Sequence, residues 1–377
     1  MHDSSNIIYE LGDLLSYEQP TAYIVESTKY DDKYKIPVLT AGKTFILGYT
    51  DETTGIYDNL PVIIFDDFTT ASQYVNFKFK VKSSAMKILI PNTELVNPKY
   101  IYYRMQIIQF DSSTHKRYWI QQYSKIKVAV PPLKEQARIV ARIEELFSQL
   151  ESGVETLKQT KAQLAVYRQA VLKEAFAHIE KKAPIRDLTT LVTSGSRGWA
   201  QYYSDRGALF IRIGNLTRTG IEINFDDIQN VFLPDRAEGL RSRLQPNDVL
   251  ISITADLGSI GLVPETIPEA YINQHIAVVR FQNSNQGKFM AYYLRSDWGQ
   301  KDLLKNKRGA GKMGLGLDDI RDTPVPVVSD DEAAEVLAEI ESRLSVCDQI
   351  EQTVDAALQQ AEALRQSILK KAFEGGL

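Results

Sequence analysis

A nine-residue segment near the middle of the chain recurs close to its C-terminus, and this repeat limits the possible folds more than any other feature. Residues 168–176 read RQAVLKEAF and residues 365–373 read RQSILKKAF, so six of nine positions are identical. Matching pairs at the same offset of 197 residues are Glu135 and Glu332, Ala141 and Ala338, Ile143 and Ile340, Glu144 and Glu341, and Ser148 and Ser345. One offset that holds over about 40 residues indicates an internal duplication.

Both copies of the repeat have the pattern of a long helix, which we place at residues 132–182 and 324–377. Apolar residues recur at steps of three, four or seven, the spacing of a coiled-coil seam. In the first copy they are Ile143, Phe147, Leu150, Val154, Leu157, Leu164 and Val171, and in the second Ile340, Leu344, Cys347, Val354, Leu358, Ala361 and Ile368. Polar residues interrupt the seams at Lys161, Arg168, Glu351 and Arg365.

The boundaries of these helices are also marked in the sequence. Pro131-Pro132 precedes the first, Ser329 can cap the second, and Gly375-Gly376 ends it. An amphipathic helix on a globular core is the simpler explanation of such a seam. Helices of about 40 residues, however, far exceed the usual length of ~10–14 residues, so we favour a pair of long helices packed on each other.

A globular segment of mixed pattern precedes each helix, over residues 1–131 and 183–323. The first contains strand-like runs at 60–65 and 73–82, and then a helix after Asn97-Pro98. The second repeats this order, with runs at 248–253 and 276–281 and a helix around 289–294. The sequence therefore predicts two α/β (α+β) domains, produced by duplication and joined by two long helices.

Connectivity predicts how these parts are arranged. A helix of about 45 residues spans roughly 65–70 Å. To pack its seam on the first helix, the second must run back antiparallel, which brings Leu377 near Met1 in a circular, pseudo-twofold arrangement. Two similar domains at a fixed separation suit an extended, bipartite ligand such as duplex DNA.

Composition bears on the class of ligand and on the compartment. The net charge of −4 comes from residues 325–377, which carry 4 basic and 11 acidic side chains, while the remainder sums to +3. Overall acidity therefore does not exclude DNA, but it predicts weak non-specific affinity. We see no apolar run of membrane-spanning length and no secretory signal, and Cys347 is the only cysteine. These features fit a cytoplasmic protein.

Several motifs together resemble the specificity subunit of type I restriction-modification systems. The most specific are VPPLKEQARIV at 130–140 and the paired RQ-x-x-LK-x-AF endings of the two helices. IRIGNL at 211–216, DVLIS at 248–252, GAGKMGL at 309–315 and FDDFTT at 65–70 are also similar to the family. The second helix departs from it, because VVSDDE at 327–332 stands where the first helix begins with PPLKEQ.

The resemblance implies a function without a reaction of its own. It implies target-recognition domains at 1–131 and 183–323, each of which reads one half of a split site in double-stranded DNA, with the helices as spacer. It also implies as partners two modification subunits, which carry S-adenosylmethionine and methylate adenine, and a restriction subunit that cleaves DNA. We accordingly expect no cofactor and no metal in this chain.

Candidate DNA contacts lie in basic, glycine-containing loops. The segment KRGAGK at 307–312 offers Lys307, Arg308 and Lys312, and the loop SGSRGW at 194–199 offers Arg197 and Trp199. The corresponding candidates in the first domain are Lys43, Lys116 and Arg117. Each has a simpler explanation: a solvated connection for 307–312, and a turn with Trp199 packed on its domain for 194–199.

Two further groups remain open from the sequence. Lys78, Lys80 and Lys82 alternate along one strand and are expected to form a solvated face rather than a binding stripe. Asp66 and Asp67 could accept hydrogen bonds from base amino groups, or could cap a turn.

Little in the sequence points to catalysis. Asn97-Pro98-Lys99-Tyr100 is similar to the Asn-Pro-Pro-Tyr site of adenine methyltransferases, but Lys99 replaces the second proline and Asn-Pro also suits a helix start. No glycine-rich S-adenosylmethionine loop precedes it, and the four histidines have no metal-binding spacing. Two rival functions remain: a coiled-coil adaptor that binds only proteins, and a self-contained DNA methyltransferase.

Overall fold

The computed structural model describes residues 6–42, 44–114, 116–233, 241–305 and 314–375. The chain forms two compact units: unit 1 consists of Met1–Leu157 and Ala356–Leu377, and unit 2 of Lys158–Asp355. Because the C-terminal segment belongs to the unit in which the chain begins, the predicted circular arrangement is confirmed. In the described parts of the chain, no helix has both the length and the apolar character needed to cross a membrane.

Two helices are far longer than the rest, as the repeat predicts. α3 spans Leu133–Ala175 and α8 spans Asp330–Phe373. α3 begins directly after the two prolines, where the Glu135 N–H donates to the Pro132 carbonyl at 2.8 Å. Proline suits this position because the first N–H groups of a helix have no partner within it.

The predicted ends of α8 are also confirmed. Ser329 precedes the helix, and its hydroxyl accepts a hydrogen bond from the Glu332 N–H at 3.3 Å. The helix ends before Gly375, whose φ of +80° lies in the left-handed region that glycine adopts without strain.

The two helices pack antiparallel in both units. In unit 1 three predicted seam residues, Ile143, Phe147 and Ile368, form one apolar cluster together with Leu369 and Ala372. In unit 2 the ion pairs show the direction of the helices. Lys161 pairs with Asp355 at 2.8 Å, and Arg168, about two turns further along α3, pairs with Asp348 at 2.7 Å. Residues with higher numbers on α3 thus contact residues with lower numbers on α8, so the helices run antiparallel.

The described residues of domain 1, the sheet-containing part of unit 1, form three small sheets. The largest has the order β2-β8-β5-β6 and a second has the order β4-β3-β7, while β1 pairs with β9. Its elements are β1 (Ile7–Glu10), α1 (Leu11–Leu14), β2 (Leu15–Glu18), β3 (Ile36–Leu39), β4 (Ile46–Thr50), β5 (Val62–Asp66), β6 (Ser72–Val75), β7 (Lys80–Val81), β8 (Met86–Pro91), α2 (Pro98–Met105) and β9 (Lys127–Val130), with 3-10 turns η1 (Pro20–Tyr23) and η2 (Tyr123–Lys125).

Domain 2, the sheet-containing part of unit 2, repeats this plan. Its sheets have the orders β11-β18-β15-β16 and β12-β14-β13-β17, and β10 pairs with β19. Its elements are β10 (Lys182–Pro184), α4 (Ile185–Leu188), β11 (Thr189–Ser194), η3 (Trp199–Tyr202), β12 (Tyr203–Ser204), β13 (Ala208–Ile211), η4 (Ile213–Asn215), β14 (Gln229–Val231), β15 (Val249–Ser252), β16 (Ile260–Leu262), β17 (Ala270–Ile272), β18 (Ile276–Phe281), η6 (Ser284–Gln286), α5 (Gly287–Arg295), α6 (Asp297–Leu303), α7 (Leu317–Arg321) and β19 (Pro324–Pro326).

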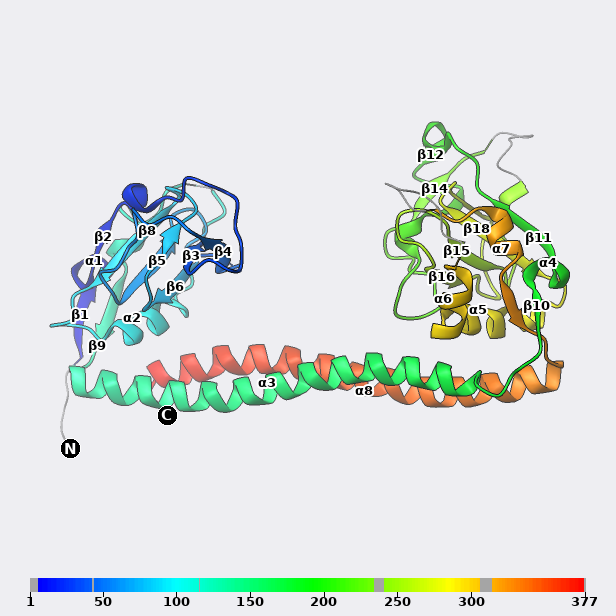
Figure 1. Ribbon diagram of the computed structural model, residues 1–377. Helices are drawn as coiled ribbons and strands as arrows, with labels where there is room; N and C mark the ends of the chain where they lie inside the picture. The colour runs from blue at the N-terminus through cyan, green and yellow to red at the C-terminus, as the bar shows by residue number, and fades with distance from the viewer. Residues whose placement is uncertain (1–5, 43, 115, 234–240, 306–313, 376–377) are drawn as a thin grey trace. The chain divides into compact units, whose positions relative to one another are not determined.

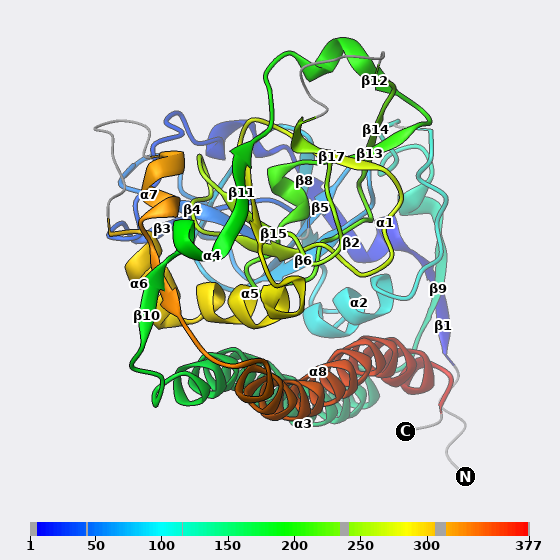
Figure 2. The same ribbon diagram turned by 90° about the vertical axis from the view of Figure 1, so that its right-hand side faces the viewer.

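The duplication predicted from the helices therefore extends to both domains. In each second sheet one strand pairs antiparallel with the next strand in sequence and parallel with a later strand, as β3 does with β4 and β7, and β13 with β14 and β17. In each unit one short helix, α2 or α5, lies between the larger sheet and the long helices (Figure 1). Figure 2 shows the same position of α5 from a second direction.

One predicted strand is wrong in its extent. The alternating run 73–82 is not one strand but two, β6 and β7, which belong to different sheets. The lysines of this run consequently do not form one solvated face. Lys80 is only 3% exposed and forms an ion pair with Glu52 at 2.7 Å, whereas Lys78 reaches Asp58 at the surface.

Candidate DNA interface

The basic segment Lys116-Arg117 of domain 1 is fixed to the turn that follows β5. Directly after it, the Tyr118 N–H donates to the Asp67 carbonyl at 2.9 Å, and the Trp119 N–H donates to the Asp67 carboxylate at 2.8 Å. Both aromatic side chains are buried, while Lys116 and Arg117 are exposed. The chain therefore presents two cations at the surface from a firmly packed base.

The turn after β5 folds because its carboxylates are used within the domain. Asp66 accepts hydrogen bonds from the N–H groups of Phe68 and Thr69, both at 2.9 Å, which is the capped turn considered above. Asp67 is 2% exposed and forms a buried ion pair with Lys87 at 3.5 Å. These carboxylates hold the turn, and the structure favours that role over contact with bases.

The neighbouring side chains add to the attachment of this segment. The Thr114 hydroxyl lies 2.9 Å from the hydroxyl of Tyr118, and the Arg117 guanidinium lies 5.9 Å from the centre of the Phe68 ring. Lys43, the other candidate in domain 1, lies outside the described residues.

Domain 2 has the same attachment at the equivalent turn, which follows β15. The Leu315 N–H donates to the Ile253 carbonyl at 3.0 Å, and Gly314 forms a β-bridge with Thr254. The basic segment with Lys307, Arg308 and Lys312 immediately precedes this attachment in the sequence, but lies outside the described residues. In both domains, therefore, the residue that is bonded to the turn follows a basic segment in the sequence: Tyr118 in domain 1 and Leu315 in domain 2.

A different set of side chains holds the turn in domain 2. Asp256 forms an ion pair with Arg218 and accepts from the Ser259 hydroxyl at 2.8 Å, while its carbonyl accepts from the Ser252 hydroxyl. The hydrogen bond from Arg218 lowers the pKa of the Asp256 carboxyl below its ordinary value, although partial burial opposes this. The carboxylate is therefore charged and committed to the turn at neutral pH.

A hollow of about 590 Å³ lies beside this turn in domain 2. Its lining consists of Ser194, Gly195, Ser196, Arg197, Arg241, Thr254, Gln274 and His275. Arg197 and Arg241 are exposed, and no carboxylate is among the residues that line the hollow in the described part of the chain. Arginine pairs with guanine edges and glutamine with adenine edges, which makes this a chemically suitable surface for base recognition.

Hydrogen bonds restrain the side chains of Gln274 and His275, which both line the hollow. The two ring nitrogens of His275 lie 2.6 Å from the Thr254 hydroxyl and 2.9 Å from the Gln274 amide nitrogen. The backbone N–H of His275 also donates to the Asn273 side-chain oxygen at 3.1 Å. The contact with His275 restrains the Gln274 side chain, which suits a residue that discriminates between bases.

The loop that carries Arg197 depends on two glycines. A Cβ at Gly195 would lie 2.2 Å from the Ile272 carbonyl oxygen, so only glycine allows this approach to the strand end. Gly198 has a φ of +82°. Trp199 is 4% exposed and packs against Phe210 at a ring distance of 4.6 Å, so it anchors the loop and leaves Arg197 as its exposed candidate.

Sequence reasoning missed Arg241, Thr254, Gln274 and His275. They come from three separate segments and belong to no motif. Arg241 lies in the connection between β14 and β15, Thr254 follows β15, and Gln274 and His275 lie between β17 and β18. The dipeptide Gln274-His275, polar between the apolar strands β17 and β18, was the only local indication.

The Asn97-Pro98 motif is a helix start, as one of the two interpretations predicted. The Asn97 side chain accepts hydrogen bonds from the N–H groups of Lys99 and Tyr100, at 2.9 and 3.2 Å. Lys99 pairs with Glu144 of α3. Both side chains therefore serve the packing of α2 on its helix.

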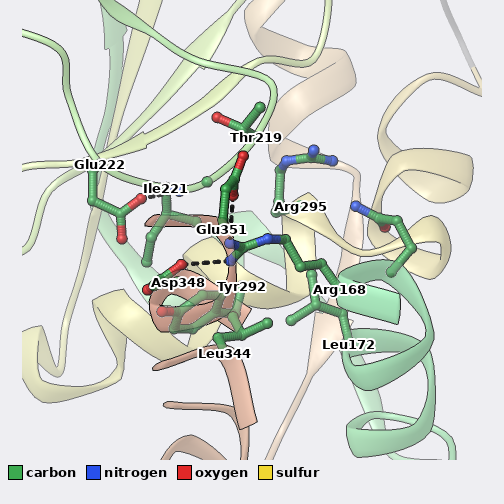
Figure 3. A pocket seen from close by; sticks show the side chains of 12 residues that line it. Arg168, Leu172, Thr219, Ile221, Glu222, Tyr292, Arg295, Leu344, Asp348 and Glu351 are labelled. Carbon is green, nitrogen blue, oxygen red and sulfur yellow. Dashed lines mark hydrogen bonds and ion pairs between the residues drawn. The ribbon is translucent and has the colours of Figure 1, made fainter. Parts of the chain in front are cut away.

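A smaller pocket of about 230 Å³ lies in unit 2 where domain 2 meets α3 and α8 (Figure 3). Arg168 reaches from α3 to Asp348 and Glu351 of α8, at 2.7 and 2.9 Å. Burial raises the pKa of Tyr292 and lowers that of Arg295, which the like charge of Arg218 lowers further. Ion pairs between the two helices line this pocket, and none of its lining residues also lines the hollow beside the turn.

These features define a class of protein: two matched binding domains, each mounted on a stretch of an antiparallel pair of long helices. Residues 6–163 and 241–360 match the family model described as "Type I restriction modification DNA specificity domain". Because the match covers well over half of the chain, the chain belongs to this family.

The curated relatives are specificity subunits from enteric bacteria. The chain is 46% identical over 187 residues to the EcoR124I/EcoR124II specificity subunit of Escherichia coli, which covers 46% of each protein. It is 27% identical over 279 residues to the EcoBI specificity subunit, 66% of this chain and 58% of that one. The matched segments thus span about half the length of these relatives.

Solved structures share the fold over nearly the whole chain. A chain from a study titled "Structural basis underlying complex assembly and conformational transition of the type I R-M system" matches with a TM-score of 0.72 and 16% identity, over 99% of this chain and 98% of that one. The HsdS subunit from Thermoanaerobacter tengcongensis matches with a TM-score of 0.50 and 18% identity, over 98% and 97%.

Proposed function

We propose that this chain is the DNA-specificity subunit of a type I restriction-modification complex, in which each domain reads one half of a bipartite site. The observation that carries the proposal is the repeated attachment of a basic segment: Tyr118 to Asp67 in domain 1, and Leu315 to Ile253 in domain 2. A duplicated protein that keeps one geometry for presenting cations suits two similar encounters with one polyanion.

In this proposal the contacts divide by role. Arg197, Arg241 and Gln274 contact base edges of the second half-site, while Lys307, Arg308 and Lys312 contact phosphates or bases of the same half-site. Lys116, Arg117 and Lys43 serve the first half-site. Trp199 supports the loop of Arg197 through its buried ring.

The chain itself is proposed to carry out no reaction. Methyl transfer and cleavage belong to modification and restriction subunits that dock on it, and the long helices set the spacer between the half-sites. The methyltransferase partner would flip its target adenine out of the duplex.

The test pairs two double variants that differ only in the domain they affect. Lys116→Ala with Arg117→Ala should impair reading of one half-site, and Arg197→Ala with Arg241→Ala the other. Each lost base-edge contact is expected to cost about 1–3 kcal/mol on the cognate half-site. Fluorescence anisotropy with duplexes carrying one intact and one scrambled half-site, in the presence of the modification subunit, measures this directly.

The matched control replaces two exposed basic residues of α3, Arg142 and Lys173, with alanine. It removes the same charge and should change affinity for all duplexes alike, with no preference for a half-site. If both domain variants behave like this control, the chain binds DNA non-specifically or acts as a protein adaptor. Methyl transfer by the isolated chain would instead support the self-contained methyltransferase.

A further inference from the structure

The long helices come from one repeat, yet only one of their ion pairs is repeated. Arg168 pairs with Asp348 in unit 2, and the residues 197 positions away, Arg365 and Glu151, pair in unit 1 at 3.4 Å. This contact is therefore common to both halves and cannot distinguish one helix from the other.

Other ion pairs between the helices of unit 2 have no counterpart at the repeat offset, among them the two described next. Lys161 reaches Asp355 at 2.8 Å, but the residues at the repeat offset are Leu358 and Lys158. The second pair joins Arg343 to Glu174 at 2.9 Å. At the repeat offset of 197, Leu146 corresponds to Arg343 and Lys371 corresponds to Glu174. These four positions make α3 and α8 different where they face each other.

The same register shows what self-pairing would bring together. If a second α3 took the place of α8, Lys158 of one copy would stand where Asp355 stands and would face Lys161 of the other. If a second α8 took the place of α3, Lys371 would stand where Glu174 stands and would face Arg343. Each like-charge contact would occur twice, because a self-pair is symmetric.

We propose that these charges form a pairing code, in which an α3 helix accepts an α8 helix and rejects another α3, and α8 likewise rejects α8. The code keeps one copy of each domain on every helix pair, so that no assembly carries two copies of domain 1 or two of domain 2. The partner that fits the exposed side of an unpaired α3 is thus a chain with an α8 helix. This inference does not depend on DNA binding.

The size of the effect follows from counting contacts. When two correct pairs rearrange into two self-pairs, each correct pair loses its Lys161–Asp355 and Arg343–Glu174 contacts, which is four in all. Four unfavourable contacts appear: two Lys158–Lys161 and two Lys371–Arg343. Exposed charge pairs change an equilibrium by roughly twofold each. Self-pairs should therefore be disfavoured on the order of 100-fold.

The test uses the full chain, cut after it has folded. A protease site is inserted between Ala177 and His178, which are both exposed and lie just after α3. Two preparations with different tags on Met1 are cleaved, mixed in intermediate urea to allow fragment exchange, and dialysed. Native mass spectrometry and tag capture then count pairs of two N-terminal fragments against pairs of an N-terminal and a C-terminal fragment.

The decisive variant creates an attraction between two α3 helices. Lys158→Glu would place a carboxylate opposite Lys161 in both halves of a self-pair. Lys158 is exposed and has no ion pair within the described part of the chain, so the native pair is barely affected. The matched control is Lys134→Glu, the same charge change on the same helix at a position that would lie beyond the other copy of α3.

We expect almost no self-pairs from the unsubstituted chain and from Lys134→Glu, and at least a tenfold increase with Lys158→Glu. Salt at 1 M should reduce the difference, because these contacts are exposed to solvent. Equal capture of self-pairs and correct pairs by the unsubstituted chain would overturn the proposal. So would a Lys158→Glu chain that remains indistinguishable from the control while its uncut form melts normally.

Discussion

The turn that anchors the basic segment is held by opposite means in the two domains. In domain 1 it depends on a buried ion pair, in which Lys87 is 1% exposed and Asp67 is 2% exposed. In domain 2 it depends on an ion pair at the surface, where the Arg218 and Asp256 side chains are 55% and 51% exposed. The position of the turn is common to both domains, but the chemistry that holds it is not.

This difference shows which part of the duplicated fold is under constraint. A buried charge pair and an exposed one differ greatly in the cost of losing a partner, because a buried charge left alone has no water to solvate it. In both domains the N–H of a distant residue nevertheless donates to the carbonyl of the first residue after the strand, Asp67 after β5 and Ile253 after β15. The common element is the attachment of the segment, as expected if the presentation of the basic segment is what the fold serves.

Loss of the buried pair should have the largest effect. Lys87→Met leaves Asp67 without its cation in the core, and we expect it to destabilise domain 1 by about 3–5 kcal/mol. Amide hydrogen exchange of β5 and β8 measures this locally. Reading of the first half-site should fall in parallel, while that of the second is retained.

A matched control for this variant lies in the same domain. Lys78→Met removes an equivalent lysine from an ion pair with Asp58 whose side chains are 63% and 64% exposed. It should cost less than about 0.5 kcal/mol. If Lys87→Met is as mild as Lys78→Met, the buried pair does not hold the turn, and the comparison between the domains fails.

The second contrast lies where each domain meets the helices. At equivalent positions of the repeat, Phe147 in unit 1 contacts Tyr103 edge-to-face at 5.7 Å and receives the Arg365 guanidinium at 4.1 Å. Unit 2 has Leu344 instead, which lines the pocket of about 230 Å³. Unit 1 is thus filled by an aromatic side chain where unit 2 keeps a pocket.

Exchanging these residues tests whether the aromatic contacts matter. Phe147→Leu gives unit 1 the residue of unit 2 and removes both ring contacts, so we expect a loss of about 1–2 kcal/mol. The reverse change, Leu344→Phe, serves as control and should cost less, because the pocket offers room for the ring. Hydrogen exchange in α2 and α5 reports each junction separately; equal losses would refute the distinction.

The features that could be predicted from the sequence are those set by local rules. Three seam residues (Ile143, Phe147 and Ile368), the prolines before α3 and the cap at Ser329 each act within one or two turns, and they are found as predicted. The start of α2 at Asn97 is equally local. The antiparallel direction followed from connectivity alone.

What escaped prediction depends on segments that are distant in sequence. The alternation around Lys80 is typical of a solvated strand, but Glu52 from another loop neutralises this lysine and permits its burial. The hollow beside the turn combines Arg241 with Gln274 and His275, which only the fold brings together. Neither propensity nor spacing contains this information.

The smallest expected effect concerns the exposed pair of domain 2, and it should depend on pH. The hydrogen bond from Arg218 lowers the pKa of Asp256 from its ordinary value of 3.8. A carboxyl whose pKa is lower in the folded state contributes stability that is complete above the unfolded value and is lost as the pH falls through the folded value. Arg218→Met should therefore destabilise domain 2 at neutral pH by about 0.5 kcal/mol.

The difference between Arg218→Met and the unsubstituted chain should then shrink as the pH is lowered below 3.8. Thermal melting followed by near-ultraviolet circular dichroism, in steps from pH 6.5 to strongly acid solution, measures this convergence. Asp256→Asn removes the opposite charge of the same ion pair and should show the same trend. A difference that stays constant through the acid range would mean that Arg218 acts through its hydrogen bond to the Leu257 carbonyl, at 2.9 Å, rather than through the charge of Asp256.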